Sequence, residues 1–491
     1  MTRWLPMIIC SMVVMVAPLW LWRPVFSSYF LKLDDFVYLS RARSAAMLGH
    51  HLLTPHNGHL TPLFLVQTHV FARLAGSIEG LPAMMGWAAY AGLAATMAGI
   101  GHVVARQTGR AEWGLAAMAG VGLSSVPGPA LLWYSASQAL LTGAVMMAML
   151  AALEAWSARG WPVALAMGFL LAIAAPFCWS AGYTAGLAGA AYLWAENRPR
   201  ARLAAALIAL GSTLAAAFAW YVASDAIRDS TRLAQLSLTD LMTVRRILDH
   251  TEQAAWEKLV FNNLGLDAPT TAGQAVMLSI AALVGWRIHR SRAETSSSRG
   301  FWNPLTAAGA VIVISNYALV FSTRGRALGY EHLRHLGWYD AIPQLGAVLF
   351  AAGVWAGPRL DAWHCPISPP SRKALSGVIA LMVLLFVMQS PRARRLVVEY
   401  DGLAARVQRL EDQTPSEPAD WAGRAGRQRA ALAALDRIEH DQAQAPTGRA
   451  ELVRQSTHWN VPGAPGELPG YSLADLIDAG AEPSSRPPGR H

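Results

Sequence analysis

Long apolar stretches alternate with short polar segments from the first residues of the chain to about residue 390. Most of these stretches approach the roughly 20 residues that an α-helix needs to cross a membrane. The pattern therefore predicts an all-α polytopic membrane protein. About eleven transmembrane helices are expected, at residues 5–21, 82–104, 113–131, 138–156, 162–178, 181–195, 203–222, 272–288, 304–321, 341–356 and 374–389. The third is expected to break at "SSVPGP", and the fifth and sixth to form a short helical hairpin.

Basic residues in the connections predict the orientation. With the N-terminus inside, the Arg-rich connections fall on the cytoplasmic side, as the positive-inside rule requires. They lie at 106–110, 159, 196–202, 287–299 and 359–373. The external segments are then 22–81, 223–271, 322–340 and the tail after about 390. Three tail arginines, Arg392, Arg394 and Arg395, lie just outside on this count, against the rule.

The external segments are themselves predicted to be partly helical. "DDFVYLSRARSAAML" and "TPLFLVQTHVFARLA" are expected to form two helices at the membrane surface. A further helix is expected at 237–261, capped by Ser237 or Thr239. We divide the chain into a transmembrane domain, residues 1–390, and a small extracytoplasmic tail, residues 391–491. The tail begins helical and becomes rich in Pro, Gly and Ser, which is typical of partial disorder.

Composition agrees with a membrane protein. The chain is 54% hydrophobic and 14% charged, whereas soluble domains carry about 25% charged residues. Its three cysteines lack the spacing of a metal site or a disulfide framework. The net charge is +9; the tail contributes 13 Arg and 14 acids, or −1, so the membrane part carries +10. That excess suits topology signals and anionic membrane lipids and requires no nucleic acid. The N-terminal stretch is interpreted as an uncleaved first span.

Two adjacent acids, Asp34 and Asp35, follow the first span in "LKLDDFVYLS". A carboxylate beside a low-dielectric wall and a like charge has a raised pKa, which suits a general base. Neighbouring helical residues point about 100° apart, so only one acid faces a given substrate. The alternative is a pair of solvated acids, or an Asp that caps a helix.

Histidines and arginines supply further candidates in the external segments. In "TPHNGHLTPLF", His56 and His59 can orient a substrate, contact phosphate oxygens or join a carboxylate at a metal. The alternative is an interfacial turn that starts the next helix. In "STRGRALGYEHLRHLGWYD", Arg324, Arg326 and Tyr330 are candidates for binding a phosphate. The alternative for the arginines is interfacial snorkelling. Weaker candidates of the same kind are Arg245, Arg246 and Lys258.

Acids are rare in the predicted spans, where Glu154 is the one example. Ion-coupled transporters keep ionisable groups at membrane depth, so this pattern disfavours a transporter. No Walker-type phosphate loop occurs in the sequence either, which disfavours an ATP-driven one.

A first span, an external Asp-Asp pair with a nearby aromatic, a His-containing turn and many later spans resemble the GT-C superfamily of membrane glycosyltransferases. The resemblance is to the bacterial relatives of the protein-mannosyltransferase and aminoarabinose-transferase branch. It rests mainly on "LKLDDFVYL" and "HNGHLTPLF". It implies Asp34 as the catalytic acid and Asp35 as the second acid. It also implies His56 or His59 as the external His, and Arg324 or Arg326 as the phosphate contact. The family's Arg-Tyr pair is not adjacent here, because Tyr330 comes later.

The activity implied by this resemblance is an inverting transfer of a sugar from a polyprenyl-phosphate donor to an acceptor hydroxyl. The acceptor class is a glycan, a lipid or a protein, and the site faces outward from the bacterial cytoplasmic membrane. No cofactor is implied, and a divalent ion is left open. A glycopolymer ligase or polymerase is the first alternative, although its large late external loop is short here. A non-catalytic scaffold of the same fold is the second.

Overall fold

The computed structural model describes residues 5–23, 26, 31, 33–42, 44–56, 58–76, 80–196, 198–230, 241–264, 282–283, 286, 303–328, 330, 333, 336–356, 367–368 and 371–412. Within these residues the chain is almost entirely helical and has no β-strand, which confirms the all-α class. Five described helical segments are long and apolar enough to cross a membrane: Leu81–Thr108, Ser135–Arg159, Pro199–Ala223, Pro304–Arg324 and Arg372–Val398. These helices indicate a membrane protein. The number of about eleven spans stays a prediction, and most of 272–288 lies outside the described residues.

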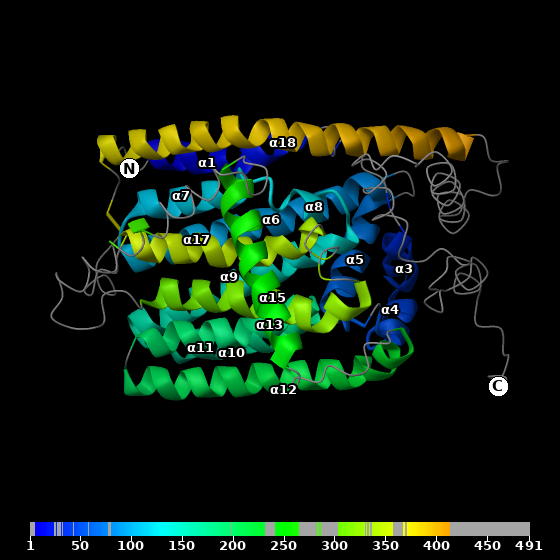
Figure 1. Ribbon diagram of the computed structural model, residues 1–491, viewed down its shortest axis with the longest axis horizontal. Helices are drawn as coiled ribbons and strands as arrows, with labels where there is room; N and C mark the ends of the chain where they lie inside the picture. The colour runs from blue at the N-terminus through cyan, green and yellow to red at the C-terminus, as the bar shows by residue number, and fades with distance from the viewer. Residues whose placement is uncertain are drawn as a thin grey trace.

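The long helices form a bundle in which most axes run in similar directions (Figure 1). Its members are α1 (Leu5–Leu21), α6 (Leu81–Thr108), α7 (Ala111–Gly122), α9 (Gln138–Arg159), α10 (Pro162–Ala174), α11 (Ala185–Ala195), α12 (Pro199–Ser230), α15 (Pro304–Leu328), α17 (Ala341–Ala356) and α18 (Arg372–Asp412). Figure 1 shows α1 and α18 along one side of the bundle and α12 along the opposite side. The same view shows α3, α4 and α5 together at one end.

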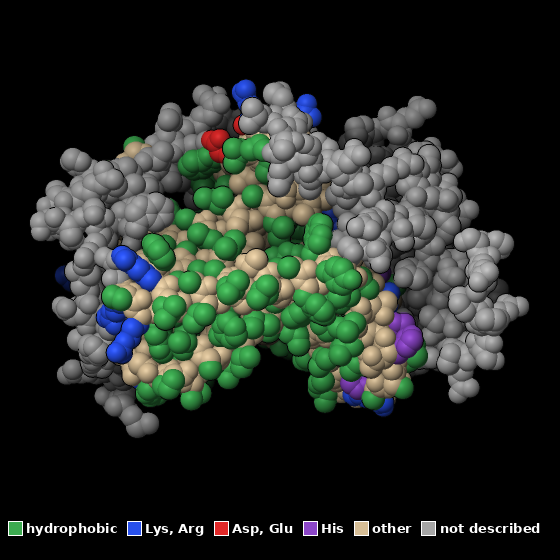
Figure 2. All heavy atoms as spheres, turned by 90° about the horizontal axis from the view of Figure 1, so that it is seen from below, with side chains coloured by type: hydrophobic (Ala, Val, Ile, Leu, Met, Phe, Trp, Pro, Cys, Tyr) green, Lys and Arg blue, Asp and Glu red, His purple; other side chains and the backbone are tan. Residues whose placement is uncertain are grey.

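The outer surface of the bundle is apolar. Figure 2 shows hydrophobic side chains over most of one face, with Lys and Arg at one edge and His near the other. On α12, exposed apolar residues recur at helical spacing: Leu203, Leu207, Leu210, Leu214 and Phe218. An apolar face of this extent, bordered by basic residues, matches the hydrocarbon and headgroup zones of a membrane.

The third predicted span is broken, as expected from "SSVPGP". Helix α7 ends at Gly122, α8 (Gly128–Leu131) follows, and η1 (Ser135–Ser137) leads into α9. Residues 132–134 are not helical, and together with the short 3-10 helix η1 they form the connection that leads into α9.

The helices expected in the predicted external segments differ in detail from the prediction. "DDFVYLSRARSAAML" was expected to form one helix and instead forms α3 (Leu33–Ala42) and α4 (Ala45–His51). The break has a local cause, since the Ser44 side chain caps α4 by accepting a hydrogen bond of 3.1 Å from the Met47 amide. Helix α5 (Pro62–Ala75) forms as expected, with Pro62 in its first turn.

The predicted helix at 237–261 is present in part. Helix α13 (Leu241–Ala254) continues into a π-helix, η4 (Ala255–Phe261), and then into η5 (Asn262–Leu264). The proposed caps Ser237 and Thr239 lie outside the described residues. Helix α18 passes residue 391 without interruption and ends at Asp412, so the start of the tail is helical as predicted. Residues 413–491 lie outside the described part of the chain, and the division into domains stays a prediction.

A tight turn joins the fifth and sixth predicted spans into the expected hairpin. Helix α10 runs into η2 (Ala175–Phe177), and η3 (Ser180–Thr184) runs into α11. Gly182 lies directly against the backbone of Ala175: a Cβ on it would be 2.0 Å from the Ala175 carbonyl oxygen. Backbone cannot move away cheaply, so the turn requires glycine at this position.

We expect Gly182→Ala to destabilise the protein by about 3 kcal/mol, because the added methyl group overlaps backbone atoms. The measurement is thermal unfolding of the purified protein in detergent. Gly49→Ala in α4 is the matched control, since nothing lies within 4 Å of its added Cβ. Alanine is also the better helix former, so the control should be neutral or slightly stabilising. Equal unfolding temperatures for wild type and Gly182→Ala would contradict the close approach.

Candidate active site

Both acids of the "LKLDDFVYLS" stretch lie in the first turn of α3. Their charge opposes the positive end of the helix dipole, which favours the ionised forms there. Asp34 is 7% exposed and Asp35 is fully buried. As expected for neighbours on a helix, the two carboxylates have different partners.

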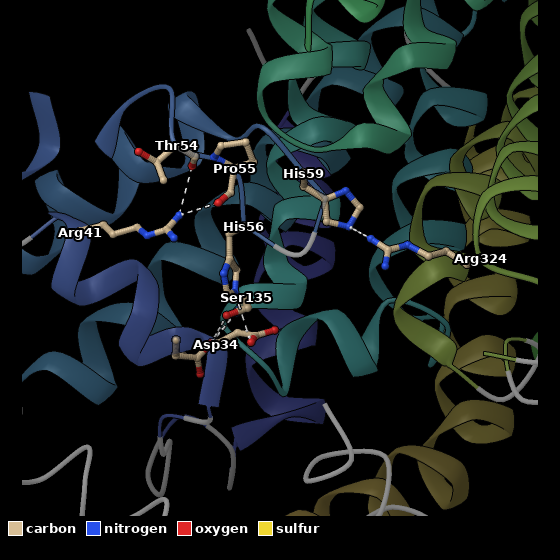
Figure 3. Close-up of polar contacts among 9 residues, drawn as sticks. Asp34, Arg41, Thr54, Pro55, His56, His59, Ser135 and Arg324 are labelled. Atoms are coloured by element: carbon tan, nitrogen blue, oxygen red, sulfur yellow. Dashed lines mark hydrogen bonds and ion pairs between the residues drawn. The ribbon is translucent and has the colours of Figure 1, made fainter. Parts of the chain in front are cut away.

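Asp34 meets His56 from the turn before α5. The distance between Asp34 Oδ1 and His56 Nε2 is 3.3 Å, and Figure 3 shows the two side chains pointing toward each other. The Tyr38 ring packs edge-on against the His56 ring, with 5.1 Å between the ring centroids. His56 therefore holds the Asp34 carboxylate in place from behind, and Tyr38 holds the imidazole.

Asp35 instead fastens α3 to the irregular connection before α9. Its Oδ1 accepts a hydrogen bond of 2.7 Å from the Ser135 amide and a second one from the Ser135 hydroxyl. A buried carboxylate with two such donors is well satisfied, and its role in this arrangement is to position Ser135 and the residues beside it.

The turn that carries both histidines is closed by its own backbone. His56 and His59 exchange hydrogen bonds between their amides and carbonyls, at 2.9 and 2.8 Å. Gly58 has a φ of 72°, which glycine adopts without strain. Arg41 from α3 donates to the carbonyls of Thr54 and Pro55 at 3.1 and 3.2 Å (Figure 3). This buried guanidinium therefore ties the start of the turn to the helix that carries Asp34.

His59 points in a different direction from His56 and meets Arg324 of α15 (Figure 3). The distance between His59 Nε2 and an Arg324 terminal nitrogen is 2.8 Å (Figure 3). Burial of the ring, followed by the nearby Arg324 and His56, lowers the pKa of His59 well below its ordinary value. The imidazole is neutral, and because arginine only donates, Nε2 accepts and Nδ1 carries the proton.

Asp34, His59 and Arg324 line one pocket at the end of the bundle where α3, α4 and α5 lie. The pocket holds about 480 Å³ of space, including the part that is open to solvent. Its other lining residues are Tyr38, Trp133, Ser135, Ala136, Gln138, Trp179, Trp338 and Tyr339. A carboxylate and a guanidinium thus lie in one concave site with aromatic walls, as ligand sites usually do.

The remaining candidates lie elsewhere. His56 supports Asp34 from behind and does not line the pocket. Tyr330 stacks on His250 of α13, with centroids 5.0 Å apart, and is not a lining residue either. The Arg326 side chain lies outside the described part of the structure. Arg245 is exposed and pairs with Asp249 on the same helix at 3.8 Å. Within the described residues, no group of three or more metal-ligating side chains is present.

Several pocket residues were missed by sequence reasoning. They come from the connection before α9 (Trp133, Ser135), from the first residue of α9 (Gln138), from the hairpin turn (Trp179) and from the segment before α17 (Trp338, Tyr339). One sequence signal does point to them: "WYSASQ" places polar side chains between two apolar runs, where a helix is interrupted. Nothing in the sequence linked that segment to residues 34 or 324.

A further buried acid, Asp340, lies beside the pocket residues Trp338 and Tyr339. Its Oδ1 accepts a 2.9 Å hydrogen bond from the Tyr317 hydroxyl. Burial raises the pKa of Asp340 from 3.8 to about 6, and Glu257 adds to this rise. Lys258, the Tyr317 bond and Arg392 act in the opposite direction. The carboxyl therefore loses its proton in a range close to neutral pH.

We expect Asp340→Asn to gain stability relative to wild type as the pH rises. Because the folded-state pKa of Asp340 is raised, its protonated form is stabilising at low pH and that contribution is lost between about pH 4 and 6. A change from 3.8 to about 6 corresponds to about 3 kcal/mol. Asparagine has no such cost and still accepts from Tyr317. Thermal unfolding at pH 5 and pH 8 covers the upper part of this range and should show about half of that change, ~1.4 kcal/mol. Exposed Asp249→Asn is the control, and a stability difference between Asp340→Asn and wild type that is the same at both pH values would contradict the prediction.

Comparisons with known proteins return no match: no family model, no curated protein and no solved structure is similar to this chain. The function proposed below therefore rests on the pocket itself.

Proposed function

We propose that this chain is a membrane glycosyltransferase of GT-C type. In this proposal it transfers a sugar from a polyprenyl-phosphate donor to an acceptor hydroxyl at the outer face of the bacterial cytoplasmic membrane. The observation that carries the proposal is one pocket, at the end of an apolar helix bundle, that holds both Asp34 and the Arg324–His59 pair. A base and a phosphate-binding cation are the two groups that this reaction requires.

Asp34 is the general base of the proposed reaction. It takes the proton of the acceptor hydroxyl while the acceptor oxygen forms a bond to the anomeric carbon of the sugar. His56 at 3.3 Å holds the carboxylate in the orientation that faces the pocket. The bond between the anomeric carbon and the phosphate oxygen breaks, and the phosphate leaves with the electron pair. A single displacement of this kind inverts the anomeric centre.

Arg324 binds the leaving phosphate. A guanidinium matches two phosphate oxygens at once and stabilises the charge that develops as the bond breaks. His59 accepts from one arm of the guanidinium and fixes its orientation. Because a lipid phosphate is already stable as an anion, no strong general acid is needed. The reaction then requires a base and a cation, which are Asp34 and Arg324 in this proposal.

An apolar surface next to the pocket fits a donor that is held in the membrane by its lipid. Exposed apolar side chains on α5, among them Val66, Val70 and Leu74, follow directly after the turn that carries His56 and His59. An external helix with such a stripe packs against lipid, so a membrane-held donor can bring its phosphate to the pocket mouth while a water-borne acceptor arrives from the other side.

The test is transfer from a radiolabelled donor. Purified protein is reconstituted into liposomes with decaprenyl-phosphate glucose, mannose or arabinose, and loss of label from the lipid is followed over time. Transfer with at least one donor, absent from protein-free liposomes, is the expected result. Absence of turnover with every donor and with mixed cell-envelope acceptors would contradict the proposal and favour a non-catalytic scaffold.

A further inference from the structure

The pocket that Asp34 and Arg324 line also has hydrogen-bonding groups that no described residue satisfies. Gln138, the first residue of α9, lines the pocket and is 4% exposed. Its amide bonds to the Tyr38 hydroxyl, and its Oε1 has no partner among the described residues. If the amide is turned the other way, its nitrogen is left over instead. One polar atom of a buried side chain is therefore unsatisfied, which is uncommon in native proteins.

His59 adds an unused donor to the same pocket. Its Nε2 accepts from Arg324, so the proton lies on Nδ1. Nδ1 is buried and, within the part of the chain that the structure describes, has no hydrogen-bond partner. Together Gln138 and His59 offer hydrogen-bonding capacity in a site where an unmade bond is costly.

Aromatic faces border these polar groups. Trp179 and Tyr339 stack with 5.5 Å between ring centroids and an interplanar angle of 18°. Trp133 and Trp338 meet edge to face at 4.9 Å. A ligand that fits such a wall has a flat apolar side to pack on the rings and hydroxyls at its edge for the unused polar atoms. A monosaccharide ring has both properties, whereas a hydrocarbon chain has no group for Gln138.

We propose that Gln138 is a specificity-determining residue that hydrogen-bonds a sugar hydroxyl, with His59 Nδ1 as a second contact and Trp179 and Tyr339 as the surface on which the ring packs. This inference rests on the proposed function and adds the part of the pocket that recognises the sugar. Arg324 binds the phosphate independently, so recognition of the sugar and of the lipid phosphate are separable.

The test measures binding of two kinds of lipid to the full-length protein in nanodiscs by calorimetric titration. One probe is decaprenyl phosphate without a sugar; the others are decaprenyl-phosphate glucose, mannose and arabinose. For wild type, at least one sugar-bearing lipid should bind about tenfold more tightly than the sugar-free lipid, as expected for a net hydrogen bond and ring packing. Gln138→Met, which keeps the shape and removes the amide, should reduce this ratio to about 1–2 while the affinity for decaprenyl phosphate is unchanged.

The control variant is Gln253→Met, at an exposed glutamine of α13 outside the pocket. Unchanged binding of decaprenyl phosphate to Gln138→Met shows that the variant is folded. A tenfold ratio that persists in Gln138→Met would overturn the assignment of Gln138 and leave sugar transfer untouched. If wild type binds every sugar-bearing lipid with the same affinity as decaprenyl phosphate, both the assignment of Gln138 and the sugar subsite are overturned. Failure of wild type to bind any of the four lipids would overturn the proposed function together with this inference.

Discussion

Under the proposed reaction, Asp34→Asn is expected to lower sugar transfer by about a hundredfold to ten-thousandfold, because the variant keeps the shape of the side chain and loses its basicity. The carboxamide can occupy the same place beside His56, whose Nε2 lies 3.3 Å from the Asp34 carboxylate. The pocket should therefore stay intact, and the loss should appear in kcat with little change in the KM for the lipid donor. Initial rates of label loss from a radiolabelled decaprenyl-phosphate sugar measure the effect.

The neighbouring acid provides an internal comparison. Asp35→Asn keeps an oxygen for the amide and hydroxyl of Ser135, and Asp35 does not line the pocket. We expect it to reduce transfer less than about tenfold, since it removes no group from the reaction centre. Exposed Asp249→Asn controls for loss of a charge alone. Equal turnover by wild type and Asp34→Asn would exclude Asp34 as the base, and a larger loss in Asp35→Asn would transfer that role to Asp35.

Arg324→Gln is expected to lower kcat by about a hundredfold to a thousandfold, because it removes the cation that the proposed reaction places on the leaving phosphate. It also removes a positive charge next to His59, so the pKa of His59 should rise, while burial of the ring still holds that pKa below its ordinary value. Arg324→Lys should retain part of the activity, since it keeps the charge and loses the planar two-pronged geometry.

Two controls separate this effect from a general loss of charge. Arg395→Gln removes an exposed arginine of α18 away from the pocket and should be active. Rescue of Arg324→Gln by added guanidinium would support a direct role in binding phosphate. Wild-type kcat in Arg324→Gln would contradict that role and would favour snorkelling at the membrane interface as the function of Arg324.

The chemistry of the site was partly predictable because its polar residues stand out in an apolar sequence. Asp34, His59 and Arg324 are candidates on the sequence alone, since charged groups at a membrane boundary require a local reason. The fold brings these three to one pocket and gives His56 a supporting place behind Asp34. It separates Tyr330 from the pocket, because Tyr330 stacks on His250. Residue type identified the candidates. Contacts between distant segments then decided which of them line the pocket and which do not.

Local structure was predicted best where a single residue controls it. Proline and glycine in "SSVPGP" end α7 as expected, and Pro62 begins α5. The break between α3 and α4 was missed because a serine cap competes with a continuous helix by a small free energy, which a pattern of apolar residues does not register. The close contact between Gly182 and the Ala175 backbone could not be predicted either, because a glycine in the sequence does not indicate which residues it will contact in the fold.

By itself, the sequence determined that the chain is an all-α membrane protein with acids, histidines and arginines outside its apolar stretches. Helix length and burial of apolar residues follow from local composition, so pattern is sufficient for them. Only the tertiary structure decided that Asp34 faces the pocket while Asp35 binds Ser135, and that Gln138 and the aromatic wall join the site. These features depend on contacts between residues that are far apart in the sequence. Packing of the whole helix bundle determines those contacts.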